Sequence, residues 1–493
     1  MSFRQHGSMA TRMTAWLAIT AMAANAVLAV PAAQAATNQP SRESEQGSRL
    51  NRAMTEVTGA DGLVSPQERE AFPLGQYEVT DDGASYFDVA ARRQFIQDRG
   101  TPNMQAQAEQ LSLSQSCAGA MNMPVMSHEI QLPGFYPQPK RWRQAAQPFF
   151  AFEDAVTRLA GRWVVTGNER PAECLTRMLA KWSQKDGFMA FSFTQATPQA
   201  WFAIESSLFA AGLAYSTVHD FAERELPEKA KQVENWLNAV SREHISKRSL
   251  GPSCCNNHFY RRALHAAING VVTDDDELFQ YGVAAIYSAL HEANPDGSLP
   301  RELIRGTRAV HYQNYANIYL NMIAQIVQRQ GYDIYDVTVK GRSLNTLANW
   351  AQDVVRHPSK IDKYVTDSQN LWFMDDPQYF AWMEVYVRDF DNEGMRTLLK
   401  PRRPTYNRSA GGFLTLYFRE PDPSNRATSP TLVQVGNAFV SETESCASDP
   451  RWHQKRDIQW RIRCERTLRE EPPRQHSTGA DIFREQLSEQ PGR

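Results

Sequence analysis

The stretch FEDAVTRLAGRW, residues 152–163, decides the fold class of this chain. Its apolar residues fall at positions i, i+3, i+4, i+7 and i+11, which is the spacing of one face of an α-helix. These residues are Phe152, Ala155, Val156, Leu159 and Trp163. The same spacing returns at residues 175–182 and 233–240, so we predict at least three amphipathic helices in this part of the chain.

Helical patterns extend well beyond these three segments. We predict further helices at residues 86–97, 259–271, 274–293 and 344–355, the third opened by a capping box from Thr273 to Asp276. Strand-like alternation is confined to residues 411–418. Short connections between successive helices indicate helical hairpins in a bundle, solenoid or toroid, and the lack of a fixed-period repeat disfavours a regular solenoid. The predicted fold class is mainly α.

The first 35 residues are typical of a secretory signal. Arg4 and Arg12 precede an apolar, alanine-rich run from Trp16 to Val30, and Ala33-Gln34-Ala35 is a small-residue cleavage motif. A membrane anchor is the alternative, but the run is short and rich in alanine. We therefore expect a periplasmic or secreted protein with no membrane attachment after the signal is removed. Its loss changes the formal charge from −2 to −4, which argues against nucleic acid as a partner.

All six cysteines follow the leader, and their even number favours disulfides in an oxidising compartment. Cys446 with Cys464 would close a modest loop near the C-terminus. A zinc site is the competing interpretation, but the sequence has no Cys-x-x-Cys pair and no His-x-x-x-His pair. We expect structural disulfides or inert thiols, and no metal or other cofactor.

The first candidate site is the phrase Cys255-Asn256-Asn257-His258-Phe259-Tyr260. Asn257 and His258 follow Gly251-Pro252 and precede a helical run, so we place them at a helix N-terminus. The free amide groups and the helix dipole there favour negative charge and a neutral imidazole. The alternative is that the asparagines only cap the helix and His258 is a surface residue.

The second candidate site is Arg308-Ala309-Val310-His311-Tyr312-Gln313-Asn314-Tyr315. On a helix, Arg308 and Tyr315 would lie about 20° short of two turns apart and would share one face, with His311 between them. A cation and a phenol in this arrangement could grip a polymer and act on it. The alternative is an arginine that covers a packed tyrosine with its alkyl stem.

These two phrases, with Asp296-Gly297-Ser298-Leu299-Pro300-Arg301-Glu302-Leu303 between them, resemble the periplasmic alginate lyases of the mannuronate-lyase type. The resemblance covers about residues 150–418 and implies an (α/α) toroid or incomplete barrel that cuts a polyuronate by β-elimination without a metal. It also implies roles: Asn257 and His258 neutralise the uronate carboxylate, Arg308 binds substrate charge, and Tyr315 shuttles the proton.

With this resemblance we divide the chain into a signal peptide (1–35), an N-terminal extension with a candidate lid (36–140), a toroid lyase domain (141–420) and a charged tail (421–493). Residues 36–70 are polar and should be mobile. The chain departs from the family where Arg261 and Arg262 follow Tyr260 in place of an aromatic residue, and no lid loop with its basic residue is recognisable in residues 72–140.

Basic residues gather around both phrases and favour an acidic polymer as the partner. They are Lys247, Arg248, Arg261, Arg262, Arg301, Arg305 and Arg308. Most runs of charge are only solvated faces. The candidate substrate-binding residues are Arg305, His311, Tyr260, Arg262 and Trp201, although Trp201 fits a core position at least as well.

We predict an exported polysaccharide lyase with alginate or polymannuronate as first substrate. Three alternatives stay open: a lyase for glucuronan or a glucuronate-containing exopolysaccharide, a non-catalytic polyuronate-binding protein of exopolysaccharide secretion, and a hydrolase that uses Asp296 and Glu302 as paired carboxylates. Asp296-Gly297 fits a turn better. The sequence predicts no oligomeric state.

Overall fold

The computed structural model describes residues 62–113, 117–129, 131–190, 198–246 and 251–420, and the backbone of two strands at 432–435 and 438–441. The chain divides into two units, residues 1–45 and 46–493, and only the second contains described residues. The predicted signal peptide, Lys247, Arg248, the Cys446–Cys464 pairing and the tail apart from its two strands lie outside the described residues.

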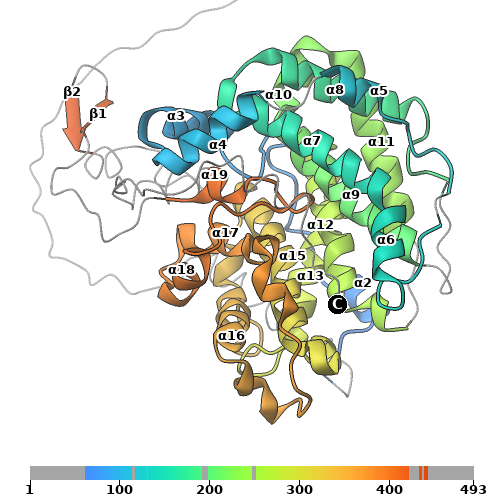
Figure 1. Ribbon diagram of the computed structural model, residues 1–493, viewed down its shortest axis with the longest axis vertical. Helices are drawn as coiled ribbons and strands as arrows, with labels where there is room; N and C mark the ends of the chain where they lie inside the picture. Colours follow the sequence, from blue (N-terminus) through green and yellow to red (C-terminus); the bar gives the residue numbers. More distant parts are fainter. Residues whose placement is uncertain are drawn as a thin grey trace, which may run out of the picture. The chain divides into compact units, whose positions relative to one another are not determined.

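Helices make up nearly all of the described secondary structure (Figure 1). The first half contains α2 (Pro66–Glu70), α3 (Val89–Arg99), α4 (Pro102–Leu113), α5 (Cys117–Asn122), α6 (Pro139–Ala145), α7 (Gln147–Thr166), α8 (Glu169–Ser183), α9 (Gln199–Ser216), α10 (His219–Glu225) and α11 (Pro227–Ser246). The second half contains α12 (Asn257–Val272), α13 (Asp276–Glu292), α14 (Pro300–Leu303), α15 (Ala309–Arg329), α16 (Leu344–Arg356), α17 (Trp382–Asp389), α18 (Glu393–Leu399) and α19 (Leu414–Phe418).

Short 3-10 helices and one hairpin complete the secondary structure of the described residues. The 3-10 helices are η1 (Gly251–Cys254), η2 (Gly306–Arg308), η3 (Ile334–Asp336), η4 (Pro358–Lys363), η5 (Trp372–Asp375) and η6 (Pro377–Phe380). Strands β1 (Leu432–Val435) and β2 (Ala438–Ser441) pair antiparallel, with Leu432 opposite Ser441.

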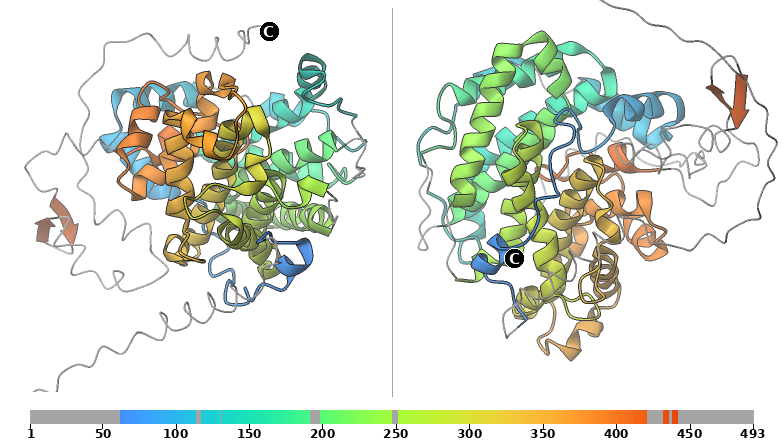
Figure 2. Two further views of the ribbon diagram at one scale, coloured as in Figure 1. Left: turned by 90° about the horizontal axis from the view of Figure 1, so that it is seen from below. Right: turned by 180° about the vertical axis from the view of Figure 1, so that it is seen from behind.

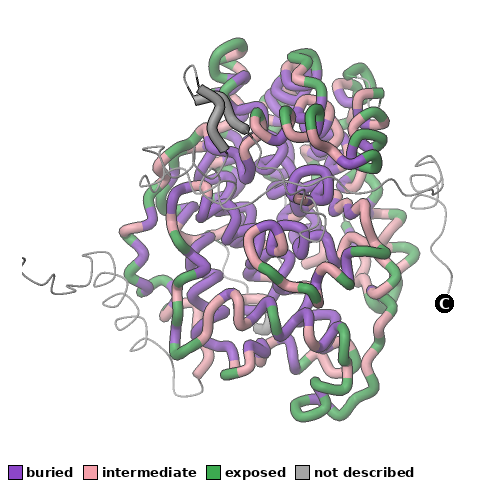
Figure 3. Tube along the Cα trace, turned by 90° about the vertical axis from the view of Figure 1, so that its left-hand side faces the viewer, coloured by how far each residue is buried: buried purple, intermediate pink, exposed green. Residues whose placement is uncertain are grey.

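The long helices form two layers. Helices α7, α9, α12 and α15 contact one another in that order and form the inner layer, and α8, α11, α13 and α16 pack outside them (Figure 1). Helix α17 continues the inner layer from α15, and α4 contacts both α7 and α19. Helices α9 and α15 are buried on nearly every side because they have neighbours all round. Figure 3 shows buried segments through the middle of the fold and exposed ones mainly at its edges. The mainly α, (α/α) toroid prediction is confirmed.

The predicted helices match observed ones, with shifts at their ends. Residues 152–163 lie in α7, 259–271 in α12 and 344–355 in α16. The capping prediction at Thr273 was wrong, because α13 begins at Asp276 and the side chain of Asp275 accepts a hydrogen bond from the Leu278 amide. The strand predicted at residues 411–418 was also wrong: Gly411 and Gly412 have positive φ and make a turn before α19.

The segment before α3 packs against the helices (Figure 2). Val64 is fully buried, and its amide donates to Glu292 Oε1 at 2.9 Å. Arg301 donates to the Val64 carbonyl at 3.0 Å, and Ser65 forms a capping box at the start of α2. The expectation of a mobile segment up to residue 70 was therefore wrong for residues 62–70.

Four cysteines in the described residues form two disulfides, as the disulfide prediction for this compartment requires. Cys117 of α5 is bonded to Cys174 of α8, and Cys254 is bonded to its neighbour Cys255 directly before α12. Among the described residues, we find no helix with the length and apolar character needed to span a bilayer.

Candidate active site

The first candidate phrase lies at the N-terminus of α12, as predicted. Asn256 is the N-cap, and its side-chain oxygen accepts a hydrogen bond from the His258 amide at 3.0 Å. Capping is therefore the role of Asn256, which leaves the side chains of Asn257 and His258 for other contacts.

Asn257 is buried and held by Glu302 of α14. Its backbone N–H donates to Glu302 Oε1 at 2.6 Å, and its Nδ2 donates to Oε2 at 2.9 Å. Burial raises the pKa of Glu302 to about 7, although both hydrogen bonds from Asn257 act in the opposite direction. The second hydrogen on Nδ2 is left for another acceptor, since one amide nitrogen carries two donors.

His258 presents a neutral imidazole. Its ring stacks on Phe202 with 3.9 Å between centroids, and its Nδ1 is buried with no hydrogen-bond partner among the described residues. Burial holds the pKa of His258 well below its usual range, and the positive charges of Arg261, Arg305 and Arg262 lower it further. A neutral ring with a bare nitrogen can accept a proton or a hydrogen bond.

The helical relation predicted between Arg308 and Tyr315 was wrong, because Arg308 ends η2 and is the cap of α15 rather than part of it. Tyr315 is half-buried in a cluster of aromatic rings. The ring centroids of His311, Tyr319 and Tyr379 lie 5.4, 5.2 and 6.0 Å from that of Tyr315. These neighbours hold the Tyr315 ring in place, and the side chain remains partly exposed to solvent.

His311 belongs to the interior of that cluster. It is 4% exposed, and burial, followed by the charges of Arg305 and Arg308, lowers its pKa to about 3. In this structure the neutral ring of His311 packs against Tyr315, and its contact with substrate stays a prediction.

Two arginines at the start of α15 are covered by tyrosine rings. The guanidinium carbon of Arg305 lies 3.6 Å from the ring centroid of Tyr312, and that of Arg308 lies 3.7 Å from the ring centroid of Tyr136. The hydroxyls of Tyr136 and Tyr312 share a hydrogen bond. Tyr136 comes from the segment before α6 and was missed in the sequence, where the only signal was the run Gly134-Phe135-Tyr136-Pro137.

Arg261 connects α12 to the tyrosines of α15. One of its terminal nitrogens donates to the Phe202 carbonyl at 2.6 Å and to the Ser206 hydroxyl. Burial acts to lower the pKa of Arg261, but Tyr315 and Tyr319, together with the carboxyls of Glu205 and Glu153, outweigh it and the pKa is raised. The sequence had placed Arg261 only among the basic residues; in the structure its guanidinium carbon lies 5.9 Å from the ring centroid of Tyr319.

Three predicted substrate-binding residues lie in the interior, and for Trp201 the core alternative is confirmed. Tyr260 is 1% exposed. Arg262 is also buried, and its Nε donates to Glu205 Oε1 at 2.9 Å. Trp201 stacks on His244 with 3.8 Å between ring centroids.

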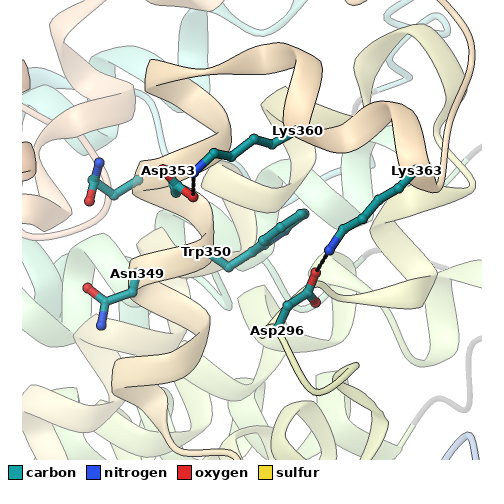
Figure 4. A pocket seen from close by; sticks show the side chains of 7 residues that line it. Asp296, Asn349, Trp350, Asp353, Lys360 and Lys363 are labelled. Atoms are coloured by element: carbon teal, nitrogen blue, oxygen red, sulfur yellow. Dashed lines mark hydrogen bonds and ion pairs between the residues drawn. The ribbon is translucent and has the colours of Figure 1, made fainter.

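A surface pocket of about 640 Å³ lies elsewhere, between α16, η4 and the turn at Asp296 (Figure 4). Its two lysines are paired: Lys360 with Asp353, and Lys363 with Asp296 at 2.6 Å. The ring of Trp350, which lines the pocket, is almost completely buried. The pairing of Asp296 with Lys363 and the full burial of Glu302 also rule out these two as the paired carboxylates of a hydrolase.

Known proteins share both sequence and fold with this chain. The family model described as "Alginate lyase" matches residues 88–361. The chain is 27% identical over 274 residues to a polysaccharide lyase of Stenotrophomonas maltophilia, covering 56% of this chain and 80% of that one. It is 28% identical over 306 residues to an alginate lyase of Azotobacter chroococcum, covering 61% and 79%.

Among solved structures, alginate lyase A1-III from Sphingomonas species A1 matches with a TM-score of 0.64 and 30% identity, over 71% of this chain and 99% of that one. Variants of that lyase with a tyrosine replaced by phenylalanine, or a histidine by alanine, have been solved with a bound tetrasaccharide.

Proposed function

Because this chain belongs to the alginate lyase family and is a polysaccharide lyase, we propose that it cleaves an anionic polyuronate, alginate or polymannuronate first, by β-elimination. The products carry 4,5-unsaturated uronate ends. The observation that carries this proposal is the place of the Arg261 guanidinium, whose carbon lies 5.9 Å from the ring centroid of Tyr319, which is itself 5.2 Å from the ring centroid of the half-buried Tyr315. This guanidinium supplies positive charge near the phenol that must exchange a proton with the sugar.

β-Elimination across a uronate has three requirements. The carboxylate must be neutralised so that the C5 hydrogen becomes acidic, a base must remove that hydrogen, and an acid must protonate the departing C4 oxygen. We assign neutralisation to the second Nδ2 hydrogen of Asn257, to His258 and to Arg308. Tyr315 is the proton shuttle.

One tyrosine can serve as base and then as acid when the C5 hydrogen and the C4 oxygen lie on the same side of the ring. This is the geometry of mannuronate and of glucuronate, so glucuronan is the second substrate to try. For the opposite C5 epimer, the bare nitrogen of neutral His258 is the candidate base.

We further propose that the enzyme is exported. The leader with Arg4, Arg12 and Ala33-Gln34-Ala35 supports this, and so do the Cys117–Cys174 and Cys254–Cys255 disulfides, which form in oxidising compartments. We assign the catalytic residues to the predicted lyase domain at 141–420, with Tyr136 contributed by the segment before it.

The test is the ultraviolet absorbance of the new C4=C5 double bond on alginate, polymannuronate and glucuronan. Tyr315→Phe and His258→Ala should each lower kcat by at least the roughly 10²- to 10⁴-fold typical of an acid–base group. Tyr335→Phe is the matched control, because it removes a buried hydroxyl that donates to Asn321 far from the site. No absorbance gain on any of the three polymers, or wild-type rates in both site variants, would refute the proposal.

A further inference from the structure

Three side chains that can bind a metal converge where the segment before α3 meets α10. They are Asp82, His219 and Glu223, and one ligand atom from each lies within 4.8 Å of the others. His219 and Glu223 are four residues apart on α10 and so share a face. Asp82 comes from a part of the chain that is distant in sequence.

His219 is held with one ring nitrogen towards the two carboxylates. It is 1% exposed, and its Nδ1 has no hydrogen-bond partner in the part of the chain that the structure describes. Glu223 Oε2 lies 3.7 Å from this nitrogen, too far for a hydrogen bond. A buried imidazole nitrogen that faces carboxylates and makes no hydrogen bond is placed to bind a cation, because neutral imidazole is a common metal ligand.

The other ring nitrogen of His219 faces a third carboxylate, that of Glu234. Nε2 of His219 lies 3.7 Å from Glu234 Oε1, which also accepts a hydrogen bond from the Tyr215 hydroxyl at 3.1 Å. Histidines that bind metals usually direct their second ring nitrogen to a carboxylate or carbonyl, which fixes the tautomer and the ring orientation. Glu234 is placed for that function.

The dimensions suit a small divalent cation. Zinc binds imidazole nitrogen and carboxylate oxygen at about 2.0–2.2 Å, so tetrahedral ligand atoms lie roughly 3.3–3.6 Å apart. The 3.7 Å separation of Nδ1 and Glu223 Oε2 is close to that value. Asp82 and Glu223 are exposed and can turn a further few tenths of an ångström inwards, whereas His219 is already fixed by burial.

We propose that Asp82, His219 and Glu223 bind a zinc ion that ties the segment around Asp82 to α10. A nitrogen ligand favours zinc over calcium or magnesium, which prefer oxygen alone. The segment is already held on both sides of Asp82, by Gln330 Oε1, which accepts from the Asp81 amide at 3.0 Å, and by the hydrogen bond between the hydroxyls of Ser85 and Ser216. The ion would fix the point between them.

The test is zinc binding by the full chain, purified after chelator treatment and dialysed against zinc, with the metal content measured by mass spectrometry. Wild type should bind one zinc at this site. Asp82→Asn and Glu223→Gln should each weaken it by more than the about 10- to 100-fold that follows loss of an outer-shell partner, and Glu234→Gln should weaken it within that range. Glu225→Gln, an equal charge change on the same helix, should bind as wild type.

A second readout is thermal unfolding with and without zinc. Zinc should raise the Tm of wild type and Glu225→Gln but not that of Asp82→Asn or Glu223→Gln, because an ion that binds only the folded state stabilises it. Absence of zinc binding at micromolar concentration, unchanged binding in Asp82→Asn and Glu223→Gln, or binding of calcium in place of zinc would each overturn the proposal. The readouts do not depend on lyase activity.

Discussion

Glu302→Gln should impair catalysis although Glu302 never reaches the substrate. The carboxylate receives two donors from Asn257, the backbone N–H at 2.6 Å and Nδ2 at 2.9 Å. A glutamine offers one acceptor and one NH₂ group to the same two donors. One donor of Asn257 must then face another donor, so the amide that we assign to the uronate carboxylate is forced to turn.

The expected loss follows from the hydrogen bond that disappears. A hydrogen bond to a charged group contributes about 1.5–3 kcal/mol. If all of this supports the transition state, kcat/KM falls by about 10- to 100-fold, since each 1.4 kcal/mol is a factor of ten. The assay is the initial rate of ultraviolet absorbance on polymannuronate, measured across substrate concentration with circular dichroism as a check on folding.

Glu292→Gln is the matched control. Glu292 is also a buried carboxylate whose pKa burial raises to about 7, but it binds the Val64 amide and Arg301 rather than Asn257. Its variant should unfold at a lower temperature and keep kcat/KM within about twofold, because the hydrogen bonds that it weakens hold Val64 and Arg301 and not Asn257. A Glu302→Gln enzyme with wild-type kcat/KM would refute the view that Glu302 positions Asn257.

Three further predictions test other contacts of the site. The pKa of His311 is lowered to about 3 in the folded state, against about 6.5 in the unfolded chain, so its contribution to stability is complete above pH 6.5 and is lost as the pH falls below that. In denaturant titrations, the free energy of unfolding of wild type should therefore drop between pH 7.5 and 5.5 by about 1.4 kcal/mol more than that of His311→Phe. Tyr136→Ala uncovers Arg308 and should raise KM several-fold with a smaller effect on kcat, whereas Tyr136→Phe keeps the ring and should raise KM less. Arg262→Met removes the ion-pair partner of the buried Glu205 and should cost about 3–5 kcal/mol of stability. Arg308→Ala should instead weaken polymer binding in a salt-dependent way and barely change stability. A stable Arg262→Met protein and an unstable Arg308→Ala protein would contradict the burial of Arg262.

The helices were predictable because their signals are local. The apolar spacing at residues 152–163 depends only on which side of one helix meets the core, and the structure has α7 there. Residues 411–418 misled the prediction because alternating side chains cannot reveal that Gly411 and Gly412 take positive φ and redirect the chain. The two-layer arrangement depended on the family resemblance, since periodicity alone left bundle and toroid open.

The site was predictable only where one short segment sets the geometry. Asn257 and His258 follow a Gly-Pro turn and start a helix, so their position was visible in the sequence. Helix α15 begins one residue after Arg308, so Arg308 and Tyr315 are not related by helical geometry as predicted. The burial of Arg262 was not visible in the sequence, because residue type gives charge but not burial.

Contacts between distant segments carry no local signal. Tyr136 reaches Arg308 from before α6, and Glu302 reaches Asn257 from a separate short helix. Either partner, taken alone, is an ordinary tyrosine or glutamate. Such pairs become visible only when the chain is folded.

The bond between Cys254 and Cys255 has a practical consequence for anyone who makes this enzyme. It closes a small ring of backbone directly before Asn256, the residue that caps α12 and leads into Asn257 and His258. Recombinant protein made in a reducing cytosol would leave these thiols reduced, and the added backbone freedom would act first on Asn257 and His258, to which we assign the uronate carboxylate. Expression routed to an oxidising compartment is therefore the condition under which specific activity should be compared between preparations.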